Sequence, residues 1–291
     1  MTTTLHNLFA ISPFVVILPF VYAAAILFEL GSGVVRLVTW RRGGEPHDAR
    51  LSAVANALFW VALILSLAAI TERYVEAGRP PFKTLFESLI LFAASTNLIY
   101  VIVSLRYRHP LLGAPAGLLL LGICVHAARK VDIEIVDLPA ALQSGWFVPH
   151  VVVYFLGYGA LALAAVAAAL HLAFPRFELW FRSRKGAVRR RLDHVMHQLN
   201  VFGFLMITLG LFVGAWWAKE AWGDWWSWDP KENWSLVTWL VYAIYLHLRL
   251  LSGWSGRRLA VVTLVGFAAV LFTYLGMHLL PTADMSEHVY Q

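Results

Sequence analysis

The sequence is poor in charged residues and almost free of cysteine. Asp, Glu, Lys and Arg make up only 14% of its 291 residues, whereas hydrophobic residues make up 60%. Soluble globular proteins carry about 25% charged residues, so this balance excludes that class. The single cysteine, Cys124, excludes an internal disulfide, a CxxC redox pair and a covalent CxxCH attachment site within the chain.

The sequence contains several long apolar runs that are almost free of charged residues. A helix needs roughly 20 apolar residues to cross the hydrocarbon core of a bilayer. Windows long enough for this purpose occur at 8–29, 52–71, 84–105, 110–128, 147–174, 195–218, 234–252 and 257–280. Strand-like alternation is absent. We therefore expect an all-α integral membrane protein, a bundle of about eight transmembrane helices that forms a single polytopic domain over 1–291.

The basic residues predict the orientation of the bundle. Most of the 23 Lys and Arg residues fall in alternate connections, above all in RSRKGAVRRR at 182–191. Positively charged loops stay cytoplasmic, so both termini are expected on the outer side. The first window lacks a basic flank and predicts a retained helix. These loops and anionic lipid account for the net charge of +6, and no nucleic-acid partner is expected.

A tryptophan-rich segment lies between the sixth and seventh windows. Residues 216–239 read WWAKEAWGDWWSWDPKENWSLVTW and hold eight of the 13 tryptophans. At 100° per residue these side chains point in nearly every direction, so one helix is a poor fit. Gly223 permits a turn, and Asp229, Pro230 and Glu232 predict the start of a helix. An aromatic belt explains one or two tryptophans at a helix end, not this cluster.

A broad aromatic surface suits a large planar apolar ligand such as heme, whose iron takes imidazole ligands. His150 opens the fifth window, and His288 lies just past the eighth. If these helices flank the tryptophan segment, the two imidazoles can approach a heme from opposite faces. His247 lies inside the seventh window, where an ionisable residue is a functional candidate, although it can also serve helix packing.

These residues resemble a known family. WGDWWSWDPKENWSLVTWLVYAIYLHLRL is similar to the "WWD" signature of CcsA-type (ResC-like) cytochrome c assembly proteins, relatives of CcmC and CcmF. The resemblance extends to WFVPHVVVYFLGYGAL and RPPFKTLFESLILF. It implies that segment 216–234 presents heme b on the periplasmic side of the inner membrane, or on the equivalent side of a thylakoid membrane. The implied heme contacts are Trp222, Trp225, Trp226, Trp228, Asp229 and Trp234, although N-capping is a sufficient role for Asp229.

The resemblance also implies the iron ligands and the partners. His150 matches the first outer histidine of the family, and His247 matches its transmembrane histidine. His288 corresponds to the second outer histidine, but the link before it is longer than usual, which leaves His278 as the alternative. The implied partners are a CcsB/ResB-like membrane subunit and an apocytochrome c with a CxxCH motif. Together they would form a cytochrome c synthase, or heme lyase.

Two other functions fit part of the pattern. A CcmC-like exporter or chaperone would hand heme to a carrier without forming a covalent bond, but such chains typically have six membrane windows. A bis-His heme b electron-transfer subunit would need histidines at two depths in neighbouring helices. The second and third windows contain none.

Overall fold

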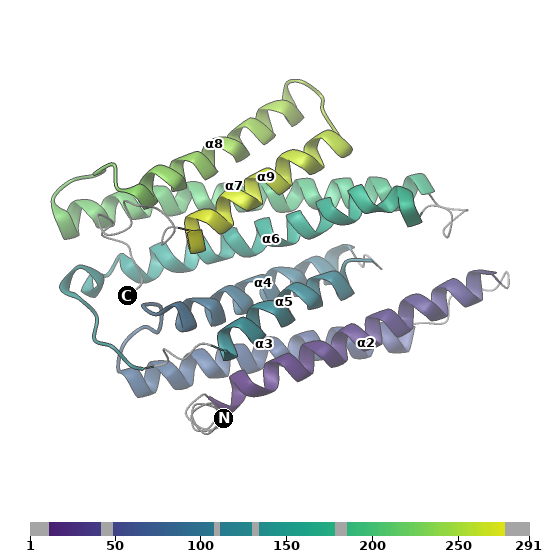
Figure 1. The fold of residues 1–291 in the computed structure, drawn as a ribbon, viewed down its shortest axis with the longest axis horizontal. Helices are drawn as coiled ribbons and strands as arrows, with labels where there is room; N and C mark the ends of the chain where they lie inside the picture. Colours follow the sequence, from purple (N-terminus) through teal and green to yellow (C-terminus); the bar gives the residue numbers. More distant parts are fainter. Residues whose placement is uncertain (1–11, 42–48, 108–110, 130–133, 178–184, 277–291) are drawn as a thin grey trace. The chain divides into compact units, whose positions relative to one another are not determined.

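The computed structural model describes residues 12–41, 49–107, 111–129, 134–177 and 185–276. Every regular element in these ranges is a helix, and the chain divides into two compact units, Met1–Val136 and Asp137–Gln291. Each unit contributes four α-helices to the ribbon (Figure 1). The all-α class is therefore confirmed. The expectation of a single polytopic domain stays a prediction.

The first unit contains α2 (Pro13–Arg41), α3 (Ala49–Ala77), α4 (Leu85–Tyr107) and α5 (Gly113–Ala128). Helices α2 and α4 each pack against both α3 and α5. The Phe59 ring lies between the rings of Tyr22 and Tyr100, with centroids 6.1 Å and 4.2 Å away. These aromatic contacts join α2, α3 and α4 in the core of the unit.

A buried carboxylate fastens the end of α3 to the start of α4. Glu87 Oε1 lies 3.1 Å from Arg79 Nη2 and 3.3 Å from Arg73 Nε. Glu87 Oε2 accepts hydrogen bonds from the backbone N–H groups of Lys83 and Thr84. Because the Thr84 hydroxyl in turn accepts from Glu87 N, the two residues form a capping box at the start of α4.

The second unit contains the short 3₁₀ helix η1 (Ala140–Gln143) and four long helices: α6 (Phe147–Phe177), α7 (Lys185–Trp222), α8 (Pro230–Leu250) and α9 (Arg257–Leu275). Helix α6 packs against α7 and α9, and α8 packs against α9. Gly157 and Gly203 bring the backbones of α6 and α7 close together, since a Cβ on Gly157 would lie 3.3 Å from the Gly203 carbonyl oxygen. Small residues at such contacts are typical of membrane helices.

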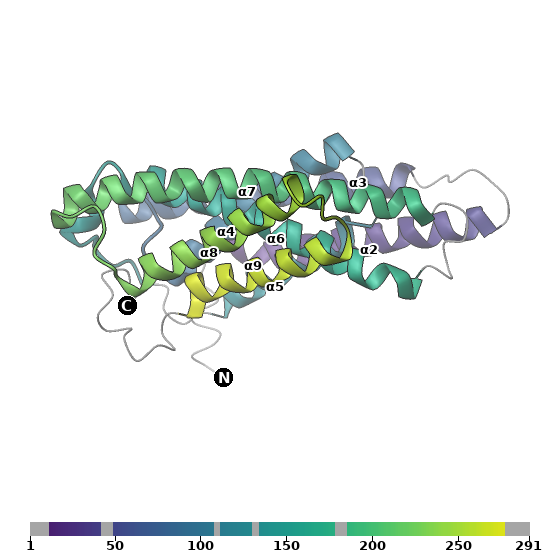
Figure 2. The ribbon, with the colours of Figure 1, turned by 90° about the horizontal axis from the view of Figure 1, so that it is seen from above.

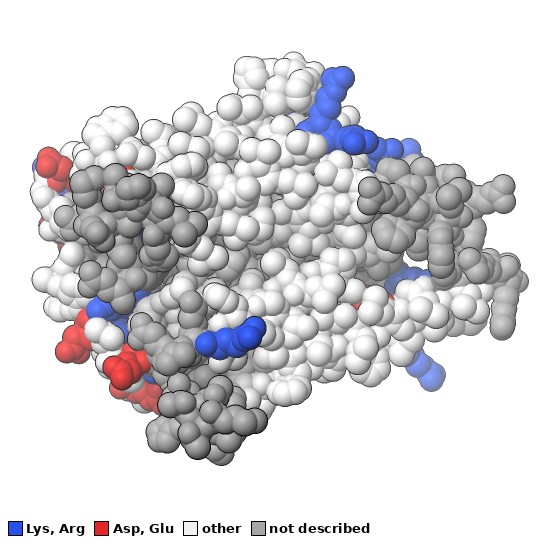
Figure 3. Space-filling view, viewed as in Figure 1, with Lys and Arg blue, Asp and Glu red and all other residues white. Residues whose placement is uncertain are grey.

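Hydropathy located every long helix of the described residues, but these helices differ in whether they can span a membrane. All eight apolar windows coincide with the helices α2 to α9. Six of the described helices are long and apolar enough to cross; α5, at 16 residues, is shorter, and α8 is not among the six. On the face drawn in Figure 3, most charged side chains lie toward the helix ends, and uncharged surface covers most of the middle. This pattern agrees with an integral membrane protein.

Helix α7 is longer than expected. It runs for 38 residues, seen along its whole length in Figure 2, and at 1.5 Å per residue this is about 57 Å. Trp216, Trp217 and Trp222 therefore belong to α7, and only residues 223–229 form a turn before α8. The sixth window was expected to end at 218, so the helix continues four residues further than expected, and the tryptophan segment is divided at the turn expected at Gly223.

Candidate functional site

The turn between α7 and α8 is fixed by backbone geometry and by a helix cap. Gly223 ends α7 with φ +92°, a conformation that glycine adopts without steric cost. Asp229 Oδ1 accepts a hydrogen bond from Lys231 N at 2.7 Å, and Glu232 Oε2 accepts from Asp229 N at 3.1 Å. With Pro230 in the first turn, this is the capping box that the sequence predicted. The Glu232 carboxylate also accepts from Ser227 N, which anchors the turn.

The tryptophans of this region form two groups around the end of α7 and a further pair, Trp226 and Trp228, whose ring centroids are 6.1 Å apart. In one group, Trp216 contacts both Trp146 and Trp225, with ring centroids 5.8 Å and 5.4 Å away. In the other, buried Trp217 contacts Trp222 at 5.2 Å and donates from Nε1 to the Ala141 carbonyl of η1. The indoles therefore tie η1, the start of α6, the end of α7 and the turn into one aromatic region.

His150 lies in the first turns of α6, against α7. Its Nδ1 is 3.0 Å from the Gly210 carbonyl oxygen. Since a carbonyl can only accept, Nδ1 carries the proton and the lone pair of the neutral ring is on Nε2. Metal-bound histidines are oriented by this kind of hydrogen bond. The imidazole is flanked by Tyr154 at 4.9 Å and Trp217 at 5.4 Å between ring centroids.

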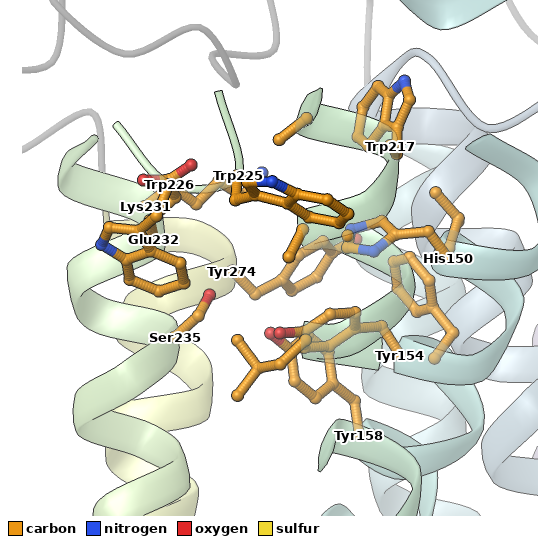
Figure 4. A pocket seen from close by; sticks show the side chains of 16 residues that line it. His150, Tyr154, Tyr158, Trp217, Trp225, Trp226, Lys231, Glu232, Ser235 and Tyr274 are labelled. Carbon is orange, nitrogen blue, oxygen red and sulfur yellow. The ribbon is translucent and has the colours of Figure 1, made fainter. Parts of the chain in front are cut away.

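A pocket opens beside His150 and contains about 760 Å³ of empty space, part of it open to solvent. All four long helices of the second unit and the turn supply its walls. In Figure 4, His150 from α6 and Lys231 from α8 lie on opposite sides, with the Trp225 indole between them. The remaining lining residues are Val151, Tyr154, Phe155, Tyr158, Leu211, Gly214, Ala215, Trp217, Ala218, Trp226, Glu232, Ser235 and Tyr274.

Three of the predicted heme contacts line this pocket, and Trp222, Trp228, Asp229 and Trp234 do not. His150, Trp225 and Trp226 are lining residues. Trp222 packs on Trp217, and Trp228 is 69% exposed. The remaining two have structural roles, because Trp234 stacks on Phe272 of α9 at 4.2 Å and buried Asp229 caps α8.

His247, the other predicted iron ligand within the described residues, does not line this pocket. His247 is exposed on α8, and the 16 residues that separate it from Lys231 correspond to about 24 Å along the helix. It is therefore on the surface of the unit, near the opposite end of α8. His288 and its alternative His278 lie outside the described residues.

Among the wall residues that sequence reasoning did not single out, three bear directly on the position of His150 or on the charge of the pocket. A Cβ on Gly214 would lie 2.6 Å from His150 Cε1, so only glycine leaves room for the imidazole. Tyr154 supports the same ring from one turn further along α6. Lys231 places a cation in the wall, and desolvation by burial lowers its pKa to about 8, although nearby Asp229 acts in the opposite direction. The Lys-Glu pair after Asp229-Pro230 was the signal, but it was read only as a helix start.

Comparison with known proteins gives a consistent result. The family described as "Cytochrome C assembly protein" matches residues 51–283. The cytochrome c biogenesis protein CcsA of Synechococcus sp. (strain RCC307) is 34% identical over 272 residues, covering 84% of this chain and 87% of that protein. CcsA of Chlamydomonas reinhardtii is 34% identical over 240 residues, which cover 78% of this chain but 66% of the relative.

A solved structure shares the fold. The cytochrome c heme lyase CcmF superposes with a TM-score of 0.60 at 20% identity, over 90% of this chain and 47% of that chain. At this identity the likeness concerns the fold alone.

Proposed function

The chain belongs to the cytochrome c assembly protein family, and from this premise we propose that it is the heme-handling subunit of a cytochrome c synthase. In this proposal heme b is a substrate that the chain holds and presents, not a resident cofactor. One observation carries the proposal: an imidazole with its lone pair on Nε2, held by the Gly210 carbonyl, forms part of the wall of an indole-lined pocket.

The residues present fit a heme. Its macrocycle is planar and largely apolar, and Trp217, Trp225 and Trp226 supply flat apolar wall. His150 would be one axial ligand of the iron, and His288, or else His278, would be the other. When the ring nitrogen that does not bind the metal donates a hydrogen bond, the ligating histidine is held in orientation and becomes more basic. The Gly210 carbonyl accepts this hydrogen bond from His150.

Catalysis would rest on positioning, because the apocytochrome itself would supply the nucleophilic thiols. The two thiols of a CxxCH motif in an apocytochrome c would add to the two vinyl groups of the heme. Each addition joins sulfur to one vinyl carbon and a proton to the other, so no oxidant is consumed. Holding one reactant in a fixed orientation can lower the activation barrier of such a reaction substantially.

A second membrane subunit, CcsB/ResB-like, would complete the synthase. His247 is exposed on the surface of α8, where a neighbouring helix can approach it. We infer that it ligates heme together with a group from this partner before the heme reaches the pocket. The pocket would then face the periplasm from an inner (plasma) membrane, or occupy the equivalent side of a thylakoid membrane, with both chain termini on that side.

The test is maturation of a co-expressed reporter cytochrome c with a CxxCH motif. His150→Ala should strongly reduce covalent heme on the reporter, and added imidazole should restore part of it by replacing the lost ligand. His126→Ala, an exposed histidine of α5, is the matched control. Normal maturation in His150→Ala would exclude His150 as an iron ligand. The same assay on His288→Ala and His278→Ala identifies the second ligand.

The surface site needs a different readout. His247→Ala should lower the heme content of the synthase purified with its partner. Unaltered heme content would mean that His247 does not ligate heme.

A further inference from the structure

We propose that Lys231 binds the carboxylates of the heme, so that the propionate edge of the macrocycle points toward α8 and the vinyl edge points away from it. This inference rests on the proposed function and adds an orientation to it. The orientation matters because the propionates and the vinyl groups occupy opposite edges of the porphyrin, and only the vinyl edge reacts.

The pocket is chemically one-sided. Its α8 wall contributes Lys231, Glu232 and Ser235, whereas its α7 wall contributes only uncharged residues. His150, on the α6 side, faces the space from the opposite direction (Figure 4). An amphiphile with a metal at its centre and anionic groups along one edge matches this arrangement. The alternative orientation would put two carboxylates against aromatic rings, and an anion buried without a partner is strongly unfavourable.

The neighbouring acids are already engaged in the turn. Glu232 Oε2 accepts from Ser227 N, Ser227 Oγ and Asp229 N, at 2.9, 3.3 and 3.1 Å. Asp229 Oδ1 accepts from the backbone N–H of Lys231. These hydrogen bonds hold the carboxylates in place as helix caps. Lys231 is thus the side chain of the described wall whose charge suits an anionic ligand.

Partial desolvation prepares Lys231 for this role. Burial lowers the pKa of its amine to about 8. Near neutral pH the amine is therefore still mostly protonated, although its ammonium group is poorly solvated. The titratable groups around the pocket are Asp229 and Glu232 from the start of α8, His150, Tyr154 and Tyr158 from α6, and Tyr274 from α9. A bound carboxylate would favour the ammonium form and raise this pKa.

Linkage then gives the sign of the pH dependence. Heme binding raises the pKa of Lys231, so binding is strongest where the amine is protonated in the heme-free protein. The affinity should fall as pH rises through about 8, because the heme-free amine then loses its proton. An arginine at this position would stay charged over the whole range.

The experiment uses the full chain in detergent and two probes, ferric heme and its propionate dimethyl ester. The equilibrium dissociation constant of each is measured by optical titration between about pH 7 and pH 9, on both sides of the Lys231 pKa. The unchanged chain should bind heme about tenfold more tightly than the ester, the effect of one charge-assisted hydrogen bond. Lys231→Met should remove this preference, and Lys231→Arg should keep it and remove the pH dependence. Lys219→Met, an exposed lysine at the end of α7 outside the pocket wall, should change neither.

The outcomes separate this inference from the proposed function. Equal affinity of the unchanged chain for heme and ester would overturn the orientation and leave heme binding intact. A preference for heme that survives Lys231→Met would assign the carboxylates to another group. If neither probe binds and His150→Ala matures cytochrome normally, the proposed function fails and the orientation fails with it.

Discussion

The imidazole of His150 lies directly over the bare backbone of Gly214. An ideal Cβ at Gly214 would be 2.6 Å from His150 Cε1 and 2.7 Å from Nδ1, well inside van der Waals contact. One turn earlier in α7, Gly210 supplies the carbonyl that holds the same ring. The missing side chain of Gly214 and the carbonyl of Gly210 therefore together determine where the proposed iron ligand lies.

Gly214→Ala should displace His150 and weaken heme binding, although the ligand itself is unchanged. The added methyl group competes with the ring for space and lengthens the bond to Gly210. We expect heme affinity to fall about tenfold or more, as for other groups that orient a metal ligand. Optical titration measures this, and added imidazole should restore the spectrum of the bound heme.

The control for that change is Gly122→Ala in α5, where a Cβ would meet nothing within 4 Å. It should bind heme as the unchanged chain does. If Gly214→Ala matches the control, the close fit at His150 is irrelevant to binding.

Trp228 has a left-handed backbone, with φ +60°, which is unfavourable for a residue with a side chain. Trp228→Gly should therefore stabilise the turn by about 1 kcal/mol. Thermal unfolding in detergent is the measurement, with Trp225→Gly as a comparison at a position without a positive φ. A lower unfolding temperature for Trp228→Gly would mean that the contacts of its indole outweigh the strain.

The Glu87 carboxylate is buried between two arginines, so its neutralisation should be costly. Glu87→Gln leaves Arg73 and Arg79 without their shared anion and should destabilise the first unit by about 3–5 kcal/mol. Glu76→Gln is the matched control, because this carboxylate is 54% exposed and lies 3.9 Å from Arg73. Its change should stay below about 1 kcal/mol. Equal unfolding temperatures for the two variants would contradict this account.

Two substitutions of Asp229 can distinguish a capping role from a direct contact with heme. Asp229→Ala should destabilise the protein by about 1 kcal/mol through loss of the cap, whereas Asp229→Asn keeps a capping oxygen. If capping is its role, Asp229→Asn should retain both stability and heme affinity. Loss of heme affinity in Asp229→Asn at unchanged stability would instead indicate a direct contact with the ligand.

The features that the sequence predicted correctly are those that depend on residues close together in the chain. Hydropathy located the helices, and Asp229, Pro230 and Glu232 predicted the cap of α8, because both signals act within a few residues. The extension of α7 through Trp222 was missed, since scattered tryptophans gave no single face. The bond between His150 and Gly210 joins residues 60 positions apart and depends on how α6 meets α7. Lys231 was missed for a similar reason, because the pocket to which it belongs forms only where four helices meet.

The length of α7 has a mechanical consequence. Near its N-terminal end, Asp193 accepts hydrogen bonds from Arg249 of α8 and from the backbone of Gly256 at the start of α9. Gly210, which lies 17 residues or about 26 Å further along the same helix, accepts the hydrogen bond from His150. A tilt imposed on α7 at Asp193 would therefore also move Gly210 and the imidazole that it holds.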